Sequence, residues 1–149
     1  MIRRTVARLT RRQRGQRALT AVAKEPKLAR LHRLRRYDFE ACICELECAE
    51  GSRVARTRLL DGTRGLYLVV RADGERAVIC CKHWPHARAG ANELRCLREQ
   101  MDALRAASGE LITCGELSEE LLATDTAPVL LVDGPALLAR IERCAKTPR

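Results

Sequence analysis

The chain has 149 residues, which is enough for one domain of ordinary size with a short extension. Apolar residues make up 46% and charged residues 32%, a composition typical of a water-soluble globular protein. No uninterrupted apolar stretch is long enough for a membrane span, and the N-terminus is charged where a secretory signal needs an apolar run. We therefore expect a cytoplasmic protein with no membrane partner. A mitochondrial transit peptide, which is also Arg-rich and poor in acids, stays open as an alternative.

The net charge of +9 at pH 7 is concentrated in the first 36 residues. Residues 1–36 hold 13 Lys and Arg against the single acid Glu25, whereas residues 37–149 hold 15 against 18 acidic residues. A block of like charge repels itself and gathers around polyanions, above all nucleic acid. The sequence therefore predicts a basic arm, residues 1–36, that binds double-stranded DNA, followed by a domain over residues 37–149. A tail that only solvates the protein is the alternative.

In the arm, leucines recur at every third position, at Leu28, Leu31 and Leu34, among good helix formers. This spacing predicts helical segments, and Pro26 divides them. The leucine stripe fits two alternatives equally well: a helix that packs on the domain, and a basic helix on the surface.

After the arm, Asp38 is expected to cap a helix that Gly51 ends. Two apolar strands, 66–70 and 76–81, flank a turn that contains Asp73-Gly74, which is the sequence pattern of a β-hairpin. The other predicted strands are 53–57, 110–114 and 129–132. The other predicted helices are a long amphipathic one over 92–107, a short one that starts at Ser118 and a final one that starts at Asp133. The order α-β-β-β-α-β-α-β-α predicts an α/β fold with a mixed sheet.

Several short motifs along these elements share their order and spacing with one nuclease family. The residues concerned are Phe39-Glu40, Gly65-Leu66-Tyr67-Leu68, Asp73-Gly74, Cys80-Cys81-Lys82, Gly115-Glu116-Leu117-Ser118-Glu119-Glu120 and Leu131-Val132-Asp133-Gly134. From about Tyr37 to Ile141 the chain resembles the Mrr-type branch of the PD-(D/E)XK restriction endonucleases. The family usually has Gly-Val-Asp-Leu at the second of these motifs and Gln-Cys-Lys at the fourth. The resemblance implies a restriction-endonuclease-like fold and DNA as partner.

Such nucleases hold Mg²⁺ against the scissile phosphate with acidic oxygens, and a lysine helps to position or activate the attacking water. The resemblance places Tyr67 at the acid position, Cys80 at the Gln or Glu position, and Lys82 at the lysine position. A phenol with a pKa of about 10 and a thiol with a pKa of about 8.5 do not supply the charged oxygens that Mg²⁺ prefers. Only Glu40 and Asp61 are left as candidate metal ligands.

The resemblance thus implies that Tyr67, Cys80 and Lys82 lie together in a degenerate cleavage site, and we expect a DNA-binding protein that needs no cofactor. The expected DNA contacts are Arg3, Arg4, Arg11, Arg12, Arg14, Arg33, Arg35, Arg36 and Lys82. An endonuclease that uses Mg²⁺ or Mn²⁺ through Glu40, Asp61 and Lys82 stays open, as does a protein-interaction or regulatory module. An oligomer is compatible with each of these.

The eight cysteines fall on predicted helices and strands, so we expect reduced thiols and not a disulfide framework. Zinc is an alternative, because cysteines and histidines gather within seven residues at Cys80, Cys81, His83 and His86. Cys80 and Cys81 point to opposite faces of a strand, however, so at most one of them joins the histidines. Trp84, which follows the strand, is expected to pack at the mouth of the site in preference to stacking on a base.

Overall fold

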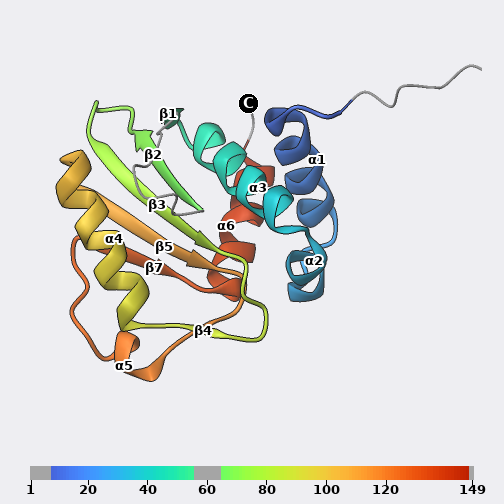
Figure 1. Ribbon diagram of the computed structural model, residues 1–149. Coiled ribbons are helices and arrows are strands. Elements are labelled where there is room, and N and C mark those ends of the chain that lie inside the picture. Colours follow the sequence, from blue (N-terminus) through green and yellow to red (C-terminus); the bar gives the residue numbers. More distant parts are fainter. Residues whose placement is uncertain (1–7, 56–64, 148–149) are drawn as a thin grey trace, which may run out of the picture.

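The computed structural model describes residues 8–55 and 65–147 of the chain. At its centre is a five-stranded sheet with the strand order β1-β2-β3-β5-β7 (Figure 1). Its strands are β1 (Arg53–Ala55), β2 (Leu66–Val70), β3 (Arg76–Lys82), β5 (Ser108–Thr113) and β7 (Val129–Val132). The helices are α1 (Arg11–Lys24), α2 (Leu28–Arg33), α3 (Arg36–Ala49), α4 (Ala91–Leu104), α5 (Glu119–Leu122) and α6 (Gly134–Lys146).

The sheet is mixed, as predicted. Strands β1, β2 and β3 pair antiparallel, whereas β3, β5 and β7 run parallel. The β2–β3 hairpin is confirmed: Gly74 has a φ of +87°, which favours glycine, and the Asp73 carboxylate accepts a hydrogen bond of 2.9 Å from the Glu75 backbone N–H. A second, parallel pair of two-residue strands, β4 (Arg88–Ala89) and β6 (Glu116–Leu117), was not predicted. Two residues are too few to show an alternating pattern.

The two faces of the sheet are covered by different helices (Figure 1). One apolar cluster joins α1, α2, α3 and α6 to one face, through residues such as Val22, Leu31, Phe39 and Ile141. The other cluster joins α4 and α5 to the opposite face, with Leu97 among its fully buried members. Helices on both faces bury the parallel strands from water.

The N-cap of helix α3 is Arg35, three residues before the predicted cap Asp38, and the helix begins at Arg36. Asp38 does not cap it; the Asp38 carboxylate lies in the first turn, 3.5 Å from the Arg14 guanidinium of α1. Gly51 follows the end of the helix with a φ of +98°, in agreement with its predicted role as a stop. The caps of the last two helices are confirmed, because Ser118 accepts from the Leu121 N–H at 3.1 Å and Asp133 from the Ala136 N–H at 2.9 Å.

The arm helices pack on the domain. Val22 of α1 and Leu31 of α2 are fully buried in the cluster that they share with α3 and α6. Gly15 of α1 lies directly against the backbone carbonyl of Ala41 in α3, so the two helices approach closely. Whether residues 37–149 fold independently of the arm stays a prediction. Residues on both sides of this boundary fill one apolar core. None of the helices described here is both long and apolar enough to cross a membrane.

Candidate functional site

The register of the hairpin decides which family positions can meet. Tyr67 pairs with Ile79, and Leu66 pairs with Cys80. Residues directly opposite each other in an antiparallel pair lie on the same face, and successive side chains alternate between faces. Cys80 and Lys82 therefore share the face of Leu66, whereas Tyr67 lies on the other one. Packing agrees, because Tyr67 contacts the cluster under α3 and Cys80 belongs to the cluster under α4.

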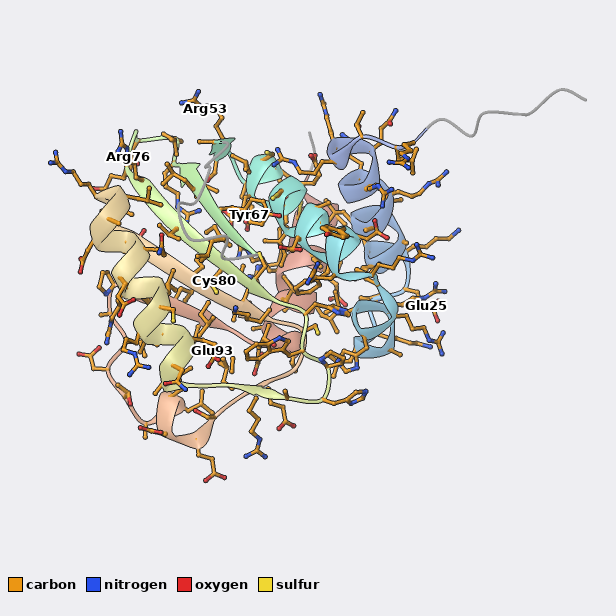
Figure 2. All side chains as sticks on the ribbon, in the orientation of Figure 1. Glu25, Arg53, Tyr67, Arg76, Cys80 and Glu93 are labelled. Atoms are coloured by element: carbon orange, nitrogen blue, oxygen red, sulfur yellow. The ribbon has the colours of Figure 1, made fainter. Side chains whose placement is uncertain are left out.

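The expectation that Tyr67, Cys80 and Lys82 lie together is therefore wrong, because the register puts Tyr67 on one face of the sheet and Cys80 and Lys82 on the other. Figure 2 labels Tyr67 on β2 and Cys80 on β3. A shift of one residue in the pairing of two strands moves a side chain to the opposite face of the sheet. The order and spacing of the motifs identify the strands but do not fix this register.

Tyr67 instead meets Glu40 of α3. The Tyr67 hydroxyl donates to Glu40 Oε1 at 3.4 Å, and the Arg36 Nε lies 3.9 Å from Glu40 Oε2. The carboxylate is buried, and a Cβ at Gly65 would lie 3.3 Å from Oε1, so the space around it is narrow. Burial, with the charge of Glu40 as a further cause, raises the pKa of Tyr67 well above its ordinary value. The phenol is therefore a neutral hydrogen-bond donor and not an anionic ligand.

On the opposite face, Cys80 is a buried thiol. Burial raises its pKa to about 11, although the nearby Lys82 lowers it, so it stays protonated at neutral pH. Lys82 is partly buried at the end of β3, and its ammonium lies 5.2 Å from the centre of the Trp84 ring, within cation–π range. Trp84 packs against the cluster under α4, in agreement with the packing role predicted for it.

These side chains do not fit a Mg²⁺ ion. Mg²⁺ demands near-octahedral oxygen coordination, usually with one or two carboxylates. On this face of the sheet, the described residues at family positions are Glu40, which supplies one carboxylate, and Tyr67, which supplies a neutral phenol. No cluster of three or more His, Cys, Asp or Glu that could hold a metal occurs in residues 8–55 and 65–147. The predicted ligand Asp61 lies outside the described residues, as do the predicted DNA contacts Arg3 and Arg4.

The other predicted arginine contacts lie on or beside α1 and α2, which together border the α3 side of the molecule (Figure 1), whereas Lys82 ends β3. Arg11, Arg12, Arg33, Arg35 and Arg36 are exposed, and Arg14 is half-buried at Asp38. Within the part of the chain that the structure describes, Arg12, Arg33 and Arg35 form no ion pair. Their charges are therefore available to an external anion.

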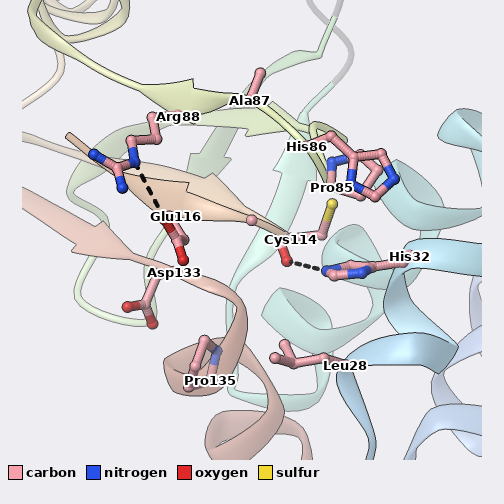
Figure 3. Close-up of a pocket in the computed structure, with 11 residues that line it drawn as sticks. Leu28, His32, Pro85, His86, Ala87, Arg88, Cys114, Glu116, Asp133 and Pro135 are labelled. Carbon is pink, nitrogen blue, oxygen red and sulfur yellow. Dashed lines mark hydrogen bonds and ion pairs between the residues drawn. The ribbon is translucent and has the colours of Figure 1, made fainter.

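A cavity of about 480 Å³ lies where β5 and β7 end (Figure 3). Its walls include His32 of α2, His86, and Cys114, and the His32 Nε2 is hydrogen-bonded to the Cys114 carbonyl at 2.9 Å. The backbone carbonyl of Leu31 in turn bonds the His83 Nε2 at 3.0 Å. None of the predicted catalytic or DNA-contacting residues lines this cavity, whereas His86, a candidate in the zinc alternative, does. Sequence analysis missed it because His32 and Cys114 are 82 residues apart.

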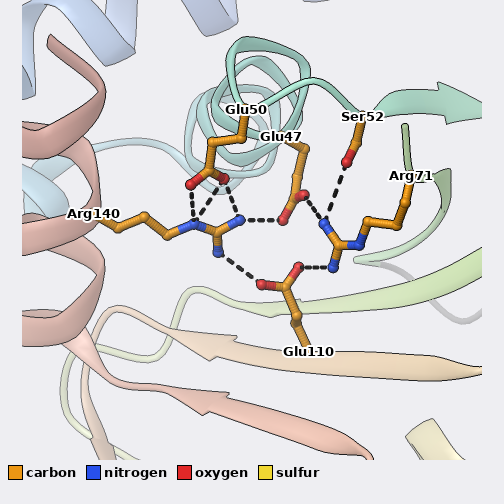
Figure 4. Close-up of polar contacts among 6 residues, drawn as sticks. All are labelled: Glu47, Glu50, Ser52, Arg71, Glu110 and Arg140. Atoms are coloured by element: carbon orange, nitrogen blue, oxygen red, sulfur yellow. Dashed lines mark hydrogen bonds and ion pairs between the residues drawn. The ribbon is translucent and has the colours of Figure 1, made fainter. Parts of the chain in front are cut away.

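A buried charge network was also missed (Figure 4). Arg71, at the end of β2, binds Glu47 of α3 at 2.8 Å and Glu110 of β5 at 3.1 Å. Arg140 of α6 binds Glu110 at 2.9 Å and also contacts Glu47 and Glu50. Burial and the neighbouring Glu110 raise the pKa of Glu47 to about 7, although Arg140 opposes the shift. The network joins two helices to the sheet, and no spacing in the sequence marks it.

The mixed sheet, its α3 and α4 layers and the hairpin define a restriction-endonuclease-like α/β domain. The family model of the Mrr-type restriction endonucleases matches residues 31–141, so the chain belongs to this family. The predicted fold class and the resemblance are thereby confirmed.

Among solved structures, the chain is similar to the DNA modification-dependent restriction endonuclease AspBHI, with a TM-score of 0.58 and 16% sequence identity. The match covers 97% of this chain and 41% of that endonuclease, so this chain spans well under half the length of the enzyme. At this identity the likeness concerns the fold alone. No curated protein matches the chain.

Proposed function

We propose that the chain binds double-stranded DNA through the exposed arginines around α1 and α2 and does not cleave it by the metal-dependent chemistry of its family. The observation that carries the proposal is that the sheet separates Tyr67 and Glu40 from Cys80 and Lys82. Family nucleases need their acidic ligands and their lysine on one side of the scissile phosphate. An arrangement split across two faces, with a phenol and a thiol in place of two ligands, does not supply this.

Binding needs only positive charge in the right place. Duplex DNA carries a high density of phosphates, and a protein that neutralises about 6–10 of them loses roughly 10³–10⁵-fold in affinity between about 50 and 200 mM salt. The proposed contacts are Arg3, Arg4, Arg11, Arg12, Arg14, Arg33, Arg35 and Arg36, together with Lys82 as a phosphate-contacting cation. Because α1 and α2 pack on the domain, the backbone that carries their arginines is held in place against it.

The test is fluorescence anisotropy of a labelled, blunt duplex across a range of salt concentrations. The triple variant Arg12→Ala, Arg33→Ala, Arg35→Ala should lower the slope of log affinity against log salt by about three, since each lost phosphate contact removes about one. The matched control is Arg53→Ala, Arg95→Ala, Arg105→Ala, which removes three exposed charges away from α1 and α2 and should leave the slope unchanged. Absence of salt-dependent binding by the native chain would favour a protein-interaction or regulatory module instead.

The second candidate is a working endonuclease that uses Glu40, Asp61 and Lys82 with Mg²⁺ or Mn²⁺. The observation in its favour is that Glu40 is a buried carboxylate beside β2, at the position where the family resemblance implies an acid. Incubation of supercoiled plasmid with each metal distinguishes the two candidates. Nicking that requires the metal and disappears in Lys82→Ala would establish the endonuclease.

A further inference from the structure

A concave site adjoins Tyr67 on the face of the sheet that α3 covers. Its volume is about 420 Å³, and it is lined by Arg11 and Arg14 of α1, Tyr37 and Ala41 of α3, and Tyr67 of β2. Two cationic and two aromatic side chains from three elements thus share one cavity. The volume lies within the range of cavities that hold small ligands.

The close approach of α1 to α3 brings the two arginines there. Gly15 lies against the Ala41 carbonyl, at a distance that any larger residue would prevent. The first turn of α1 is also fixed, because Thr10 accepts from the Gln13 N–H at 3.1 Å and the Gln13 side chain accepts from the Thr10 N–H at 2.9 Å. Arg11 follows the cap directly, so an ordered turn holds it at the cavity.

The charged residues that line the cavity are both arginines. Among the described residues, the Arg11 guanidinium has no hydrogen-bonding or ion-pair partner, and Arg14 has the carboxylate of Asp38 at 3.5 Å. A third guanidinium, that of Arg36, lies 4.9 Å from the centre of the Tyr37 ring. Two acids are nearby: Asp38, which faces Arg14, and Glu40, which accepts from Tyr67 and lies 3.9 Å from Arg36. The Arg11 guanidinium, which lacks a partner among the described residues, is therefore available to an anion in the cavity.

The aromatic residues favour a flat ring beside that anion. Tyr37 is 63% exposed, which is unusual for so large a ring, and one of its faces is taken by Arg36. Exposed aromatic faces and guanidinium planes are the surfaces on which unstacked bases stack in single-stranded nucleic acids. Guanidinium groups bind phosphate through paired hydrogen bonds.

We propose that this cavity binds one nucleotide at the 5′-phosphorylated end of a DNA strand, with the phosphate on Arg11 and Arg14 and the base against Tyr37. The arginines then provide the positive charge that a metal ion provides in cleaving relatives. The proposal rests on the proposed DNA-binding function but names a separate contact, since a closed duplex has no free end to enter the cavity.

The test is isothermal titration calorimetry with the full chain and 2′-deoxythymidine 5′-monophosphate, with thymidine as the ligand that lacks the phosphate. The monophosphate should bind at least about tenfold more tightly, because a charge-assisted hydrogen bond contributes on this scale. Arg11→Ala should lose about that factor for the monophosphate. Arg17→Ala, an exposed arginine on the same helix and outside the cavity, should keep it. Tyr37→Phe should retain binding that Tyr37→Ala weakens.

A monophosphate that binds no better than thymidine, or an Arg11→Ala variant with native affinity and a native circular dichroism spectrum, would overturn the proposal. A 5′-phosphorylated oligothymidylate should bind more tightly than its 5′-hydroxyl form; binding of the mononucleotide without this difference would make the free nucleotide the ligand. The two proposals fail separately, because binding to supercoiled plasmid, which has no strand end, tests the DNA-binding function alone, and the mononucleotide tests the cavity.

Discussion

The hydroxyl of Tyr67 and the carboxylate of Glu40 lie 3.4 Å apart, so that a phenol from β2 meets an acid from α3. Family members are expected to place an acid at each of these two positions. In this chain a neutral donor bonded to the carboxylate replaces a second negative charge. The pair is stable without a cation between its members, whereas two carboxylates so close together would need a shared proton or a cation.

A second carboxylate at this point should create a response to Mg²⁺. Tyr67→Asp adds a second acid on the side of the buried Glu40, so we expect a lower midpoint of thermal unfolding than in the native chain, and partial recovery in millimolar MgCl₂. Differential scanning calorimetry with and without the metal measures this. Tyr67→Phe is the control and should not respond. Equal responses of the native chain and the Asp variant would contradict the account of the site. Cleavage should not appear in the Asp variant, since Lys82 stays on the other face.

The close contact of α1 with α3 predicts that a glycine-to-alanine substitution inside a helix lowers stability here, where it would normally raise it. Alanine in place of glycine inside a helix normally stabilises by about 0.5–1 kcal/mol. At Gly15 the new methyl group would collide with the Ala41 carbonyl, so Gly15→Ala should destabilise by about 1–3 kcal/mol in urea unfolding. Gln16→Ala, at the exposed neighbouring position, should change stability little. A stabilised Gly15→Ala variant would show that α1 is not packed as described.

Local patterns were enough to predict most of the fold. The hairpin, the caps at Ser118 and Asp133, and the strand 129–132 depend on residues that are close in sequence, so their signals are visible without the structure. The relation of the arm to the domain was not visible in this way. A leucine stripe shows that a helix has an apolar side, but not what covers it, and Leu31 reaches the core only because α2 folds back on α3 and α6.

The candidate site was harder to predict because its geometry depends on long-range pairing. Sequence motifs identified Glu40, Tyr67, Cys80 and Lys82, but their spacing could not reveal the one-residue register that places Tyr67 opposite Ile79. The cavity beside Tyr67 was equally hidden, because Arg11 is 56 residues away from it in sequence. The composition did reveal the basic arm that supplies Arg11, but it did not reveal that the arm packs beside Tyr67.

The buried network predicts that the loss of one of its charges lowers the stability of the fold strongly. Arg140→Met leaves Glu47 and Glu110 without one of their two cations in a site from which water is excluded, and removal of one partner of a buried ion pair costs about 3–5 kcal/mol. Chemical denaturation measures the loss. Arg143→Met, on the exposed side of the same helix, should cost far less. Similar small losses for both variants would mean that the network adds little to stability.

Glu47 also predicts a pH dependence. Its pKa in the folded chain is raised from 4.5 to about 7, so between these values the folded state binds more protons than the unfolded state. The contribution of this group to stability is therefore largest at low pH and falls as pH rises from about 4.5 to about 7. The difference in unfolding free energy between the native chain and Glu47→Gln should decrease across this interval. A difference that is constant or increases would assign the titration to another group.

The most direct test of the central claim is one mixture in which binding and cleavage are measured together. Supercoiled plasmid is incubated with the chain and either Mg²⁺ or Mn²⁺ at low salt. One gel, run with the protein present, shows retardation of the plasmid; a second gel, run after the protein is removed, shows whether the plasmid is still supercoiled. The account predicts retarded plasmid that is still supercoiled once the protein is removed, for the native chain and for Lys82→Ala alike. Metal-dependent nicking by the native chain that is lost in Lys82→Ala would contradict it.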